Sequence, residues 1–237
     1  MTCIDNLLLQ ATVVSFVSMT GANTTTTSPS ENSVEKPTSC GMFRRWVSFE
    51  NSTRSYILIV PSSLCRQSLG QGEVRVAPLI LAFAWYGGKS WEVCRLFKDA
   101  MEGQGFVSAG LDGVGDSFNA GACCGPALEL GLDDVAFASA VLQHVLAHRV
   151  LMRGVHLSKQ AVYALGVSNG GFMASILAQR WPFLRGFVSL SGHTYDLPAE
   201  VTVAPKVALL YWHYYDDCVR YEGCCAQAEE CCVLISE

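Results

Sequence analysis

The chain has 237 residues, of which 50% are hydrophobic and 16% charged, and its formal net charge is -5. This length and apolar content suffice for one sizeable buried core, so a single main globular domain is expected. The acidic balance and the scattered Lys and Arg residues exclude a surface that follows nucleic-acid phosphates. We therefore predict no nucleic-acid partner and favour a small molecule or a neutral polymer.

The N-terminal segment, residues 1–22, is predicted to be a signal peptide. An apolar stretch from Leu7 to Val17 is followed by small residues, and it is too short for a membrane span. The first residues include Asp5 and no Lys or Arg, so an N-terminal core helix or a frayed tail remains the alternative. Residues 23–40 are a Thr/Ser-rich linker that can bury little apolar area. We expect a secreted protein whose mature chain has no membrane span.

Cysteines and sequons agree with an extracellular protein. The 11 cysteines exceed ordinary cytosolic usage, so disulfide bonds are expected, although the sequence does not give their connectivity. Sequons for N-glycosylation stand at Asn23 and Asn51. The spacing CCAQAEECC matches no zinc-ligand pattern, so neither a metal nor another cofactor is predicted. The divergent tail, residues 224–237, is expected to form disulfides or surface thiols, and an intermolecular disulfide handle is its structural alternative.

The first predicted elements of the folded domain are strands. Residues 44–63 contain two β-rich runs around a polar turn with Asn51, which predicts an antiparallel hairpin. Residues 77–84, APLILAFA, form a continuous apolar run typical of a strand covered on both faces. Helical spacing follows from Ser90 to Gln104 and ends at Gly105. A second buried strand, GFVSAGLD, leads into a glycine-rich loop.

Strands and helices alternate in the second half. Residues 133–150 predict a long amphipathic helix with Asp133 or Asp134 as its N-cap. Three further buried strands are expected, and an apolar helix separates the first two; the strands cover 161–167, 186–192 and 206–212, and the helix 169–181. This alternation predicts an α/β domain over residues 41–223, with a mostly parallel sheet and helices on both faces.

Ser168 lies in a Gly-x-Ser-x-Gly pattern that starts at Gly166 and ends at Gly170. It follows a predicted strand, and Asn169 opens a helix, which is the setting of a nucleophile elbow. An elbow strains the backbone of its serine, and the glycines leave room for the close packing that this requires. The alternative is a serine that merely caps the helix.

Several blocks in order, between Trp46 and Gly223, resemble those of a known family. They are TRSYILIVPSS, the YGG turn after PLILAFA, LDGVGDSFNAGACCGPA followed by DDVAF, VSNGGFMA, and HYYDDCVRYEG. The chain resembles the α/β-hydrolase esterases of the polyhydroxybutyrate-depolymerase-like and feruloyl-esterase-like kind, in carbohydrate esterase family one. The resemblance implies an α/β-hydrolase fold and a secreted serine esterase. Its substrates would be feruloyl or acetyl esters of polysaccharides, or polyhydroxyalkanoates.

The resemblance also implies roles for individual residues. Ser168 is the expected nucleophile and Asp217 the expected acid of the triad, with Asp216 as the competing choice. Ser before Asp is the chain order of this fold. The carboxylate would hold an imidazole base in the correct tautomer.

The expected oxyanion hole consists of two backbone amides, those of Asn169 and Tyr86. The family usually has His-Gly just before the second position, where this chain has Ala84 and Trp85. Because the donor belongs to the main chain, the substitution need not abolish the hole. Trp85 is nevertheless expected to narrow it or to tilt the amide.

The resembled family places its catalytic histidine beyond the last strand, tens of residues after the acid. No histidine follows His213 here, so the last strand and helix and the triad base are expected to be missing and activity to be severely impaired. A truncated or mis-spliced product, a relocated base, and a pseudoenzyme or binding module that keeps the cleft all fit this pattern. In a binding module, Trp85, Tyr86 and Trp91 would be the stacking surfaces. Among the histidines, His193 is the one candidate substitute base. Solvated or capping roles are expected for His144 and His148 on the long helix and for His156 in a connecting loop. The resemblance implies that His213, at the end of a strand, is not the triad base.

Overall fold

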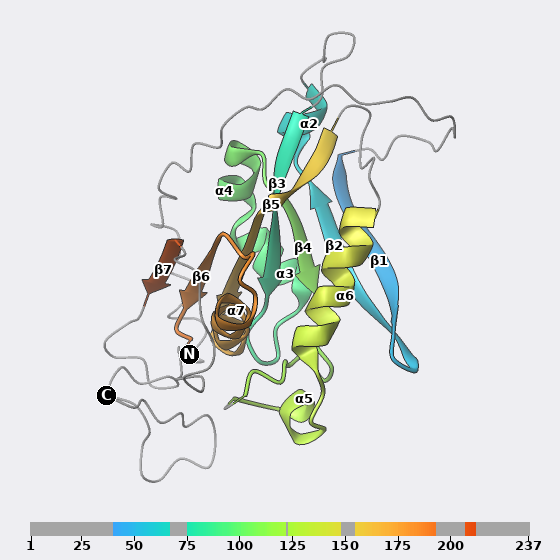
Figure 1. Cartoon of the computed structure of the whole chain (residues 1–237), viewed down its shortest axis with the longest axis vertical. Helices are drawn as coiled ribbons and strands as arrows, with labels where there is room; N and C mark the ends of the chain where they lie inside the picture. The colour runs from blue at the N-terminus through green and yellow to red at the C-terminus, as the bar shows by residue number, and fades with distance from the viewer. Residues whose placement is uncertain (1–39, 67–74, 122, 148–154, 193–206, 212–237) are drawn as a thin grey trace.

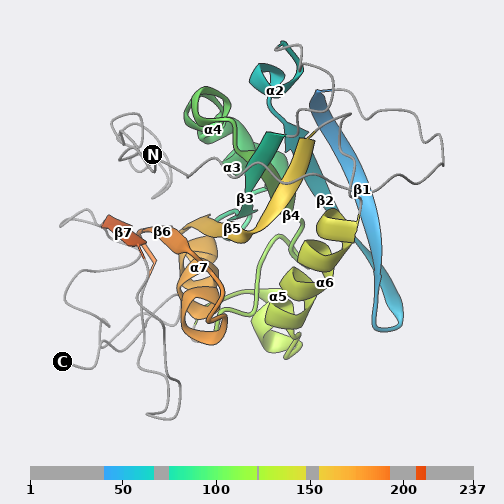
Figure 2. The ribbon, with the colours of Figure 1, turned by 45° about the horizontal axis from the view of Figure 1, so that its top comes forward.

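The computed structural model describes residues 40–66, 75–121, 123–147, 155–192 and 207–211. Its strands form one mixed sheet in the order β1-β2-β4-β3-β5-β6-β7, with β1 and β7 at opposite edges (Figures 1 and 2). The strands are β1 (Gly41–Phe49), β2 (Ser52–Val60), β3 (Arg75–Phe83), β4 (Val107–Leu111), β5 (Val155–Val167), β6 (Gly186–Leu190) and β7 (Val207–Tyr211). The helices are α2 (Ser62–Arg66), α3 (Ser90–Leu96), α4 (Lys98–Gln104), α5 (Pro126–Glu129), α6 (Asp134–Ala147) and α7 (Asn169–Arg180).

The N-terminal hairpin is confirmed. Strands β1 and β2 pair antiparallel from Gly41↔Val60 to Phe49↔Ser52, and the exposed Asn51 lies in the turn between them. Strand β2 also pairs antiparallel with β4. The pairs β3·β4, β3·β5, β5·β6 and β6·β7 are parallel. The prediction of a mostly parallel sheet is therefore confirmed.

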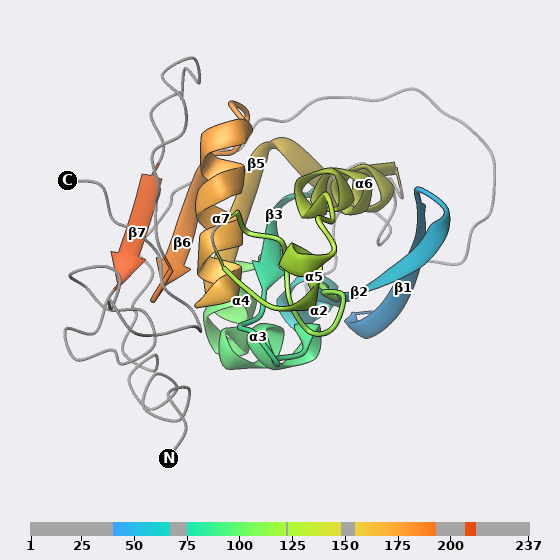
Figure 3. The same cartoon turned by 90° about the horizontal axis from the view of Figure 1, so that it is seen from below.

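Helices cover both faces of the sheet, as predicted. Helices α6 and α7 lie on one face, and α3 and α4 lie on the other (Figure 3). Alternate residues of β3 point to opposite faces of the sheet. Leu79 and Leu81 pack with α6 and α7, whereas Ile80 and Ala82 pack with α3 and α4. This period of two explains why the strand reads as a continuous apolar run.

One predicted helix is wrong in extent. The expected helix over residues 90–104 is broken into α3 and α4 at Phe97, whose φ of -103° and ψ of 10° leave the helical range. Phe97 is itself buried, and the break allows Val93 of α3 and Met101 of α4 to reach the same apolar cluster. Gly105 ends α4 as predicted, with a left-handed φ of 68°.

Strand β5 begins earlier than its apolar run predicts. Residues 155–157 pair with the start of β3, and the register shifts between Ala77 and Leu79. Pro78 stands at this shift, where a residue without an N–H interrupts the ladder. His156 therefore lies in a strand, and its predicted place in a connecting loop was wrong.

The described part of α6 starts at Asp134 and has Asp133 as its N-cap. The Asp133 Oδ1 atom accepts a hydrogen bond of 2.8 Å from the Ala136 amide, so the first of the two predicted caps is the one used. No helix in the described ranges is long and apolar enough to cross a membrane. The predicted signal peptide, the linker up to residue 39, the tail, and the expected loss of the last strand and helix concern residues outside the described ones.

Candidate active site

Ser168 occupies a strained turn between β5 and α7. Its φ of 52° and ψ of -118° are unusual for a residue with a side chain. The Ser168 amide donates to the carbonyl of Leu190 at 2.7 Å, and its carbonyl accepts from Gly171 at 2.7 Å and Phe172 at 3.1 Å. The hydroxyl makes no capping hydrogen bond. The serine thus stands at the helix N-cap position, but its side chain does not act as a cap.

Glycines allow the first turn of α7 to approach the sheet. A Cβ atom on Gly166 would lie 1.9 Å from the carbonyl oxygen of Gly170. One on Gly170 would lie 2.1 Å from the carbonyl oxygen of Phe83 at the end of β3. Both contacts are with backbone, so no side chain can move aside. The elbow glycines named from the sequence are therefore required by packing.

The turn after β3 holds the amide of Tyr86 in a fixed orientation. The Trp85 carbonyl accepts a hydrogen bond from Gly88 at 2.9 Å, and the Gly87 amide donates to the Asp116 carbonyl at 2.8 Å. These two bonds fix both peptide groups that flank Tyr86. Strands β3 and β5 are neighbours and parallel, so this turn and the elbow lie at the same edge of the sheet.

The Trp85 indole is almost fully buried, with 9% of its surface exposed. It lies against Gly88, where a Cβ atom would be 2.7 Å from the ring. The Tyr86 side chain is 47% exposed, and its ring lies against Gly125. Trp85 is a packing residue, and of the proposed stacking surfaces only Tyr86 and Trp91 are exposed to solvent.

The side chain of Asn169 connects the elbow to the β4–α5 loop, residues 112–125 without residue 122. Its Oδ1 atom accepts from the Phe118 amide at 2.8 Å, and its Nδ2 atom donates to the carbonyls of Phe118 and Cys123, both at 3.0 Å. Asn169 is completely buried. The sequence pattern points only to the backbone amide of this residue, because the partners of its side chain lie about 50 residues away in the chain and give no local signal.

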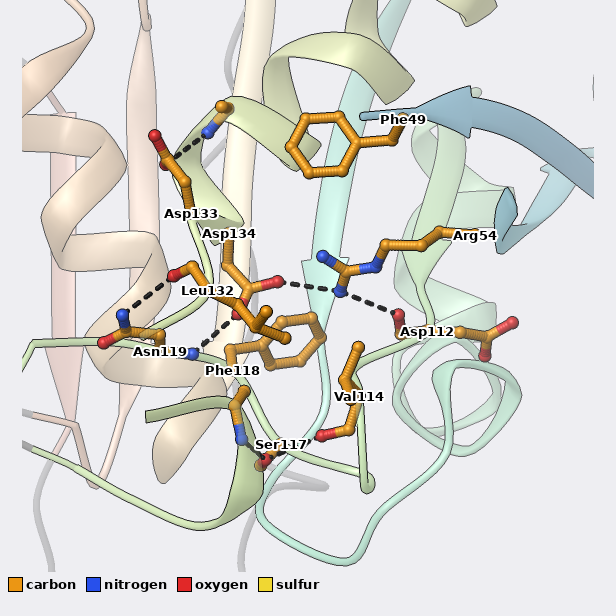
Figure 4. A network of polar contacts seen from close by, with 12 residues as sticks. Phe49, Arg54, Asp112, Val114, Ser117, Phe118, Asn119, Leu132, Asp133 and Asp134 are labelled. Atoms are coloured by element: carbon orange, nitrogen blue, oxygen red, sulfur yellow. Dashed lines mark hydrogen bonds and ion pairs between the residues drawn. The ribbon is translucent and has the colours of Figure 1, made fainter. Parts of the chain in front are cut away.

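A buried ion pair lies behind the same loop (Figure 4). Arg54 of β2 is 2.7 Å from the Asp134 carboxylate, and their side chains are 9% and 0% exposed. The other carboxylate oxygen of Asp134 accepts from the Asn119 amide at 2.7 Å. Arg54 also donates to the Asp112 carbonyl at 3.3 Å, and its guanidinium lies 3.5 Å from the centre of the Phe137 ring. This pair was not predicted from the sequence, because no local pattern indicates a contact between β2 and α6.

The other carboxylates of the loop have cationic partners. Asp112 lies 2.5 Å from Arg44 and accepts hydrogen bonds from Ser55, at 2.6 Å, and Ser90. Asp116 lies 2.5 Å from Lys89 at the surface. These groups therefore serve the structure of the loop.

The expected disulfides are geometrically possible at two places, since the sulfur atoms of Cys40 and Cys65 lie 1.95 Å apart and those of Cys123 and Cys124 lie 2.02 Å apart. Cys94 is a buried thiol, and burial raises its pKa from 9.0 to about 12, with a smaller opposing effect of a hydrogen bond with Ser108. It stays protonated near neutral pH and is no competing nucleophile. In the described part of the chain, no group of three or more His, Cys, Asp or Glu side chains could hold a metal ion.

Two of the five histidines lie among the described residues. His144 of α6 shares a hydrogen bond of 2.9 Å with the Tyr56 hydroxyl, and burial raises the pKa of Tyr56 from 10.0 to about 12, opposed by the charge of Arg45. His156 is exposed on β5. The candidate base His193, the candidate acids Asp217 and Asp216, and the remaining histidines, His148 and His213, lie outside the described residues.

The sheet order, the antiparallel β2 and the serine turn between β5 and α7 define an α/β-hydrolase fold, as predicted. No protein-family model matches the sequence, and no curated protein matches it.

The chain is similar to solved structures of low sequence identity. Acylaminoacyl peptidase from Pyrococcus horikoshii aligns at 15% identity and a TM-score of 0.45, over 65% of this chain and 24% of that one. A 2,6-dihydroxy-pseudo-oxynicotine hydrolase aligns at 19% identity and a TM-score of 0.46, over 65% and 38%. S-formylglutathione hydrolase from Staphylococcus aureus aligns at 13% and 0.46, over 65% and 59%. The chain thus spans less than two thirds of the length of these structures.

Proposed function

We propose that this protein is a serine hydrolase of carboxylic esters. The observation that carries the proposal is the backbone of Ser168, which is held in a left-handed, strained conformation between β5 and α7 while its hydroxyl caps nothing. Strain of this kind persists where the surrounding structure enforces it, and it is typical of functional sites. The backbone around Ser168 therefore supports a nucleophile better than it supports a turn residue.

The reaction would follow the acyl-transfer scheme. The Ser168 Oγ atom forms a bond to the ester carbonyl carbon while its proton passes to a general base, and the carbonyl oxygen becomes an alkoxide. The Asn169 and Tyr86 amides would donate to that alkoxide. Collapse releases the alcohol, which takes up the proton, and water then releases the acid from the acyl-enzyme. As the first residue of a helix, Asn169 has an amide without an intrahelical partner, which supports this role.

The test is turnover of p-nitrophenyl acetate and labelling by a fluorophosphonate, with wild type compared to Ser168→Ala. We expect S168A to lose the label and to retain less than about one-tenth of the wild-type turnover. Ser175→Ala is the matched control, because Ser175 lies in the same helix and its buried hydroxyl has no hydrogen-bond partner among the described residues. Equal turnover in wild type and S168A would refute the proposal.

A second set of variants tests which residues serve as the general base and the triad acid. His193 follows Gly192, whose backbone lies against Gly171 of α7, so we propose His193 as the substitute base and Asp217 as the acid that orients it. His193→Ala and Asp217→Asn should then lower turnover toward that of S168A, with Asp216→Asn as the control for the acid. Wild-type turnover in H193A would show that His193 is not the base. A loss of turnover in D216N but not in D217N would assign the role of the acid to Asp216.

Feruloyl or acetyl esters of polysaccharides and polyhydroxyalkanoates are the substrate classes that we propose, on the resemblance of the sequence blocks. We also propose secretion, which the Cys40–Cys65 disulfide and the cysteine content support. A non-catalytic binding module is the second candidate, favoured by the exposed Tyr86 ring. Binding of ferulate or an oligosaccharide that survives S168A, without any hydrolysis, would favour it.

A further inference from the structure

We propose that the Asn169 side chain is a positioning residue. Through the β4–α5 loop, it fixes the position of the Tyr86 amide relative to the Asn169 amide, the two proposed oxyanion donors. This inference rests on the proposed function and adds a role that differs from that of the Asn169 backbone amide. Its three hydrogen bonds are all to backbone groups of the loop, and they satisfy one acceptor and both donor hydrogens of the carboxamide. Few side chains other than a carboxamide can accept from one backbone group and donate to two others.

The same loop holds the other donor. The Asp116 carbonyl accepts from Gly87, next to Tyr86, and Gly125 lies under the Tyr86 ring, where a Cβ atom would be 2.6 Å from the ring. The loop therefore contacts the elbow through Asn169 and the Tyr86 turn through Asp116 and Gly125. A shift of the loop relative to the elbow would move the Tyr86 amide with respect to the Asn169 amide.

The burial of the two connections differs. Asn169 is completely buried, so its hydrogen bonds form away from water and an unpaired partner would be costly. On the other side, the Lys89–Asp116 ion pair is 51% and 38% exposed and contributes little rigidity. Of these two contacts, the Asn169 carboxamide is therefore the stronger connection to the loop.

The experiment compares wild type, Asn169→Ala, Asn169→Asp and a matched control, Asn119→Ala. Both N169A and N169D keep the backbone amide, and N169D keeps the acceptor for Phe118 but turns an oxygen toward two carbonyls. Asn119 lies on the same loop, and among the described residues its side chain donates to Leu132 at 2.8 Å and accepts from Gly121 at 3.3 Å, both away from the 166–171 turn in the chain. Active sites are titrated with the fluorophosphonate, so that kcat refers to folded, reactive enzyme.

We expect kcat/KM for p-nitrophenyl acetate to fall by about 10- to 100-fold in N169A and N169D, with KM changed less than about twofold. The inhibition constant of an alkyl trifluoromethyl ketone, which forms a tetrahedral adduct with the serine, should rise by the same factor. A purely structural role would leave this constant and the titrated kcat unchanged. An equal loss in N119A would assign the effect to the loop in general and overturn the role of Asn169.

Hydrogen exchange gives a readout that does not depend on activity. The Phe118 amide donates to Asn169, so its protection should fall at least about tenfold in N169A and stay near wild type in N119A. If the wild-type chain has no Ser168-dependent turnover, the proposed function fails, and exchange alone decides whether Asn169 holds the loop. Unchanged protection of Phe118 in N169A overturns the inference in either case.

Discussion

The two turns that would form the oxyanion site end neighbouring strands, yet they are held in different ways. The elbow at Ser168 is packed by backbone contacts of its own glycines with each other and with the end of β3. The turn at Tyr86 is held partly by the Gly88–Trp85 hydrogen bond and partly by a loop that follows a different strand. The conformation of the elbow is fixed mainly by close backbone packing of its glycines, whereas that of the Tyr86 turn depends on hydrogen bonds and contacts with a segment distant in the chain. Substitutions at the two turns should therefore fail in different ways.

The largest effect is expected at Gly170. In Gly170→Ala the new methyl group would lie 2.1 Å from the carbonyl oxygen of Phe83 and 2.6 Å from that of Ala84, so α7 must move off the sheet. We expect G170A to lower the free energy of unfolding by more than about 3 kcal/mol, above the usual range for an overpacked site because both contacts are with backbone.

Gly103→Ala is the matched control for this measurement. Gly103 lies in helix α4, and a Cβ atom there would have no neighbour within 4 Å among the described residues beyond its own helix backbone. Alanine should stabilise this helix by about 0.5–1 kcal/mol. Urea unfolding followed by circular dichroism measures both variants, and a G170A protein as stable as wild type would refute the steric account of the elbow.

Local patterns predicted the strand–turn–helix arrangement at Ser168, and the same holds for much of the fold. The hairpin, the parallel strands and the Gly105 helix end each follow from a short run of residues with a fixed period or a left-handed glycine. The break at Phe97 and the early start of β5 were missed, because they depend on which apolar cluster and which strand lie nearby. The Asn169 carboxamide was missed for the same reason, since its partners come from another loop.

An intermediate effect is expected at the buried ion pair behind the β4–α5 loop. Arg54→Ala leaves the fully buried Asp134 carboxylate without its cation. We expect a loss of about 3 kcal/mol, the lower end of the range for a broken buried pair, because the Asn119 amide still donates to Asp134. Arg44→Ala, which removes a 44% exposed side chain from Asp112, is the control and should cost less than about 1 kcal/mol. If both arginine variants lose the same stability by urea unfolding, burial does not govern the strength of these pairs.

The smallest effect is expected at the surface contact of the Tyr86 turn. Lys89→Ala removes an ion pair whose side chains are 51% and 38% exposed, but it keeps the hydrogen bond between the Gly87 amide and the Asp116 carbonyl. We expect a loss of less than about 1 kcal/mol that shrinks further in 1 M NaCl, where the screening length falls to about 3 Å. The loss in G170A should be unchanged by the same salt, because a steric overlap is not screened. Urea unfolding of both variants at low and high salt makes this comparison, and a salt-independent loss above about 2 kcal/mol in K89A would show that the turn, like the elbow, is held by packing.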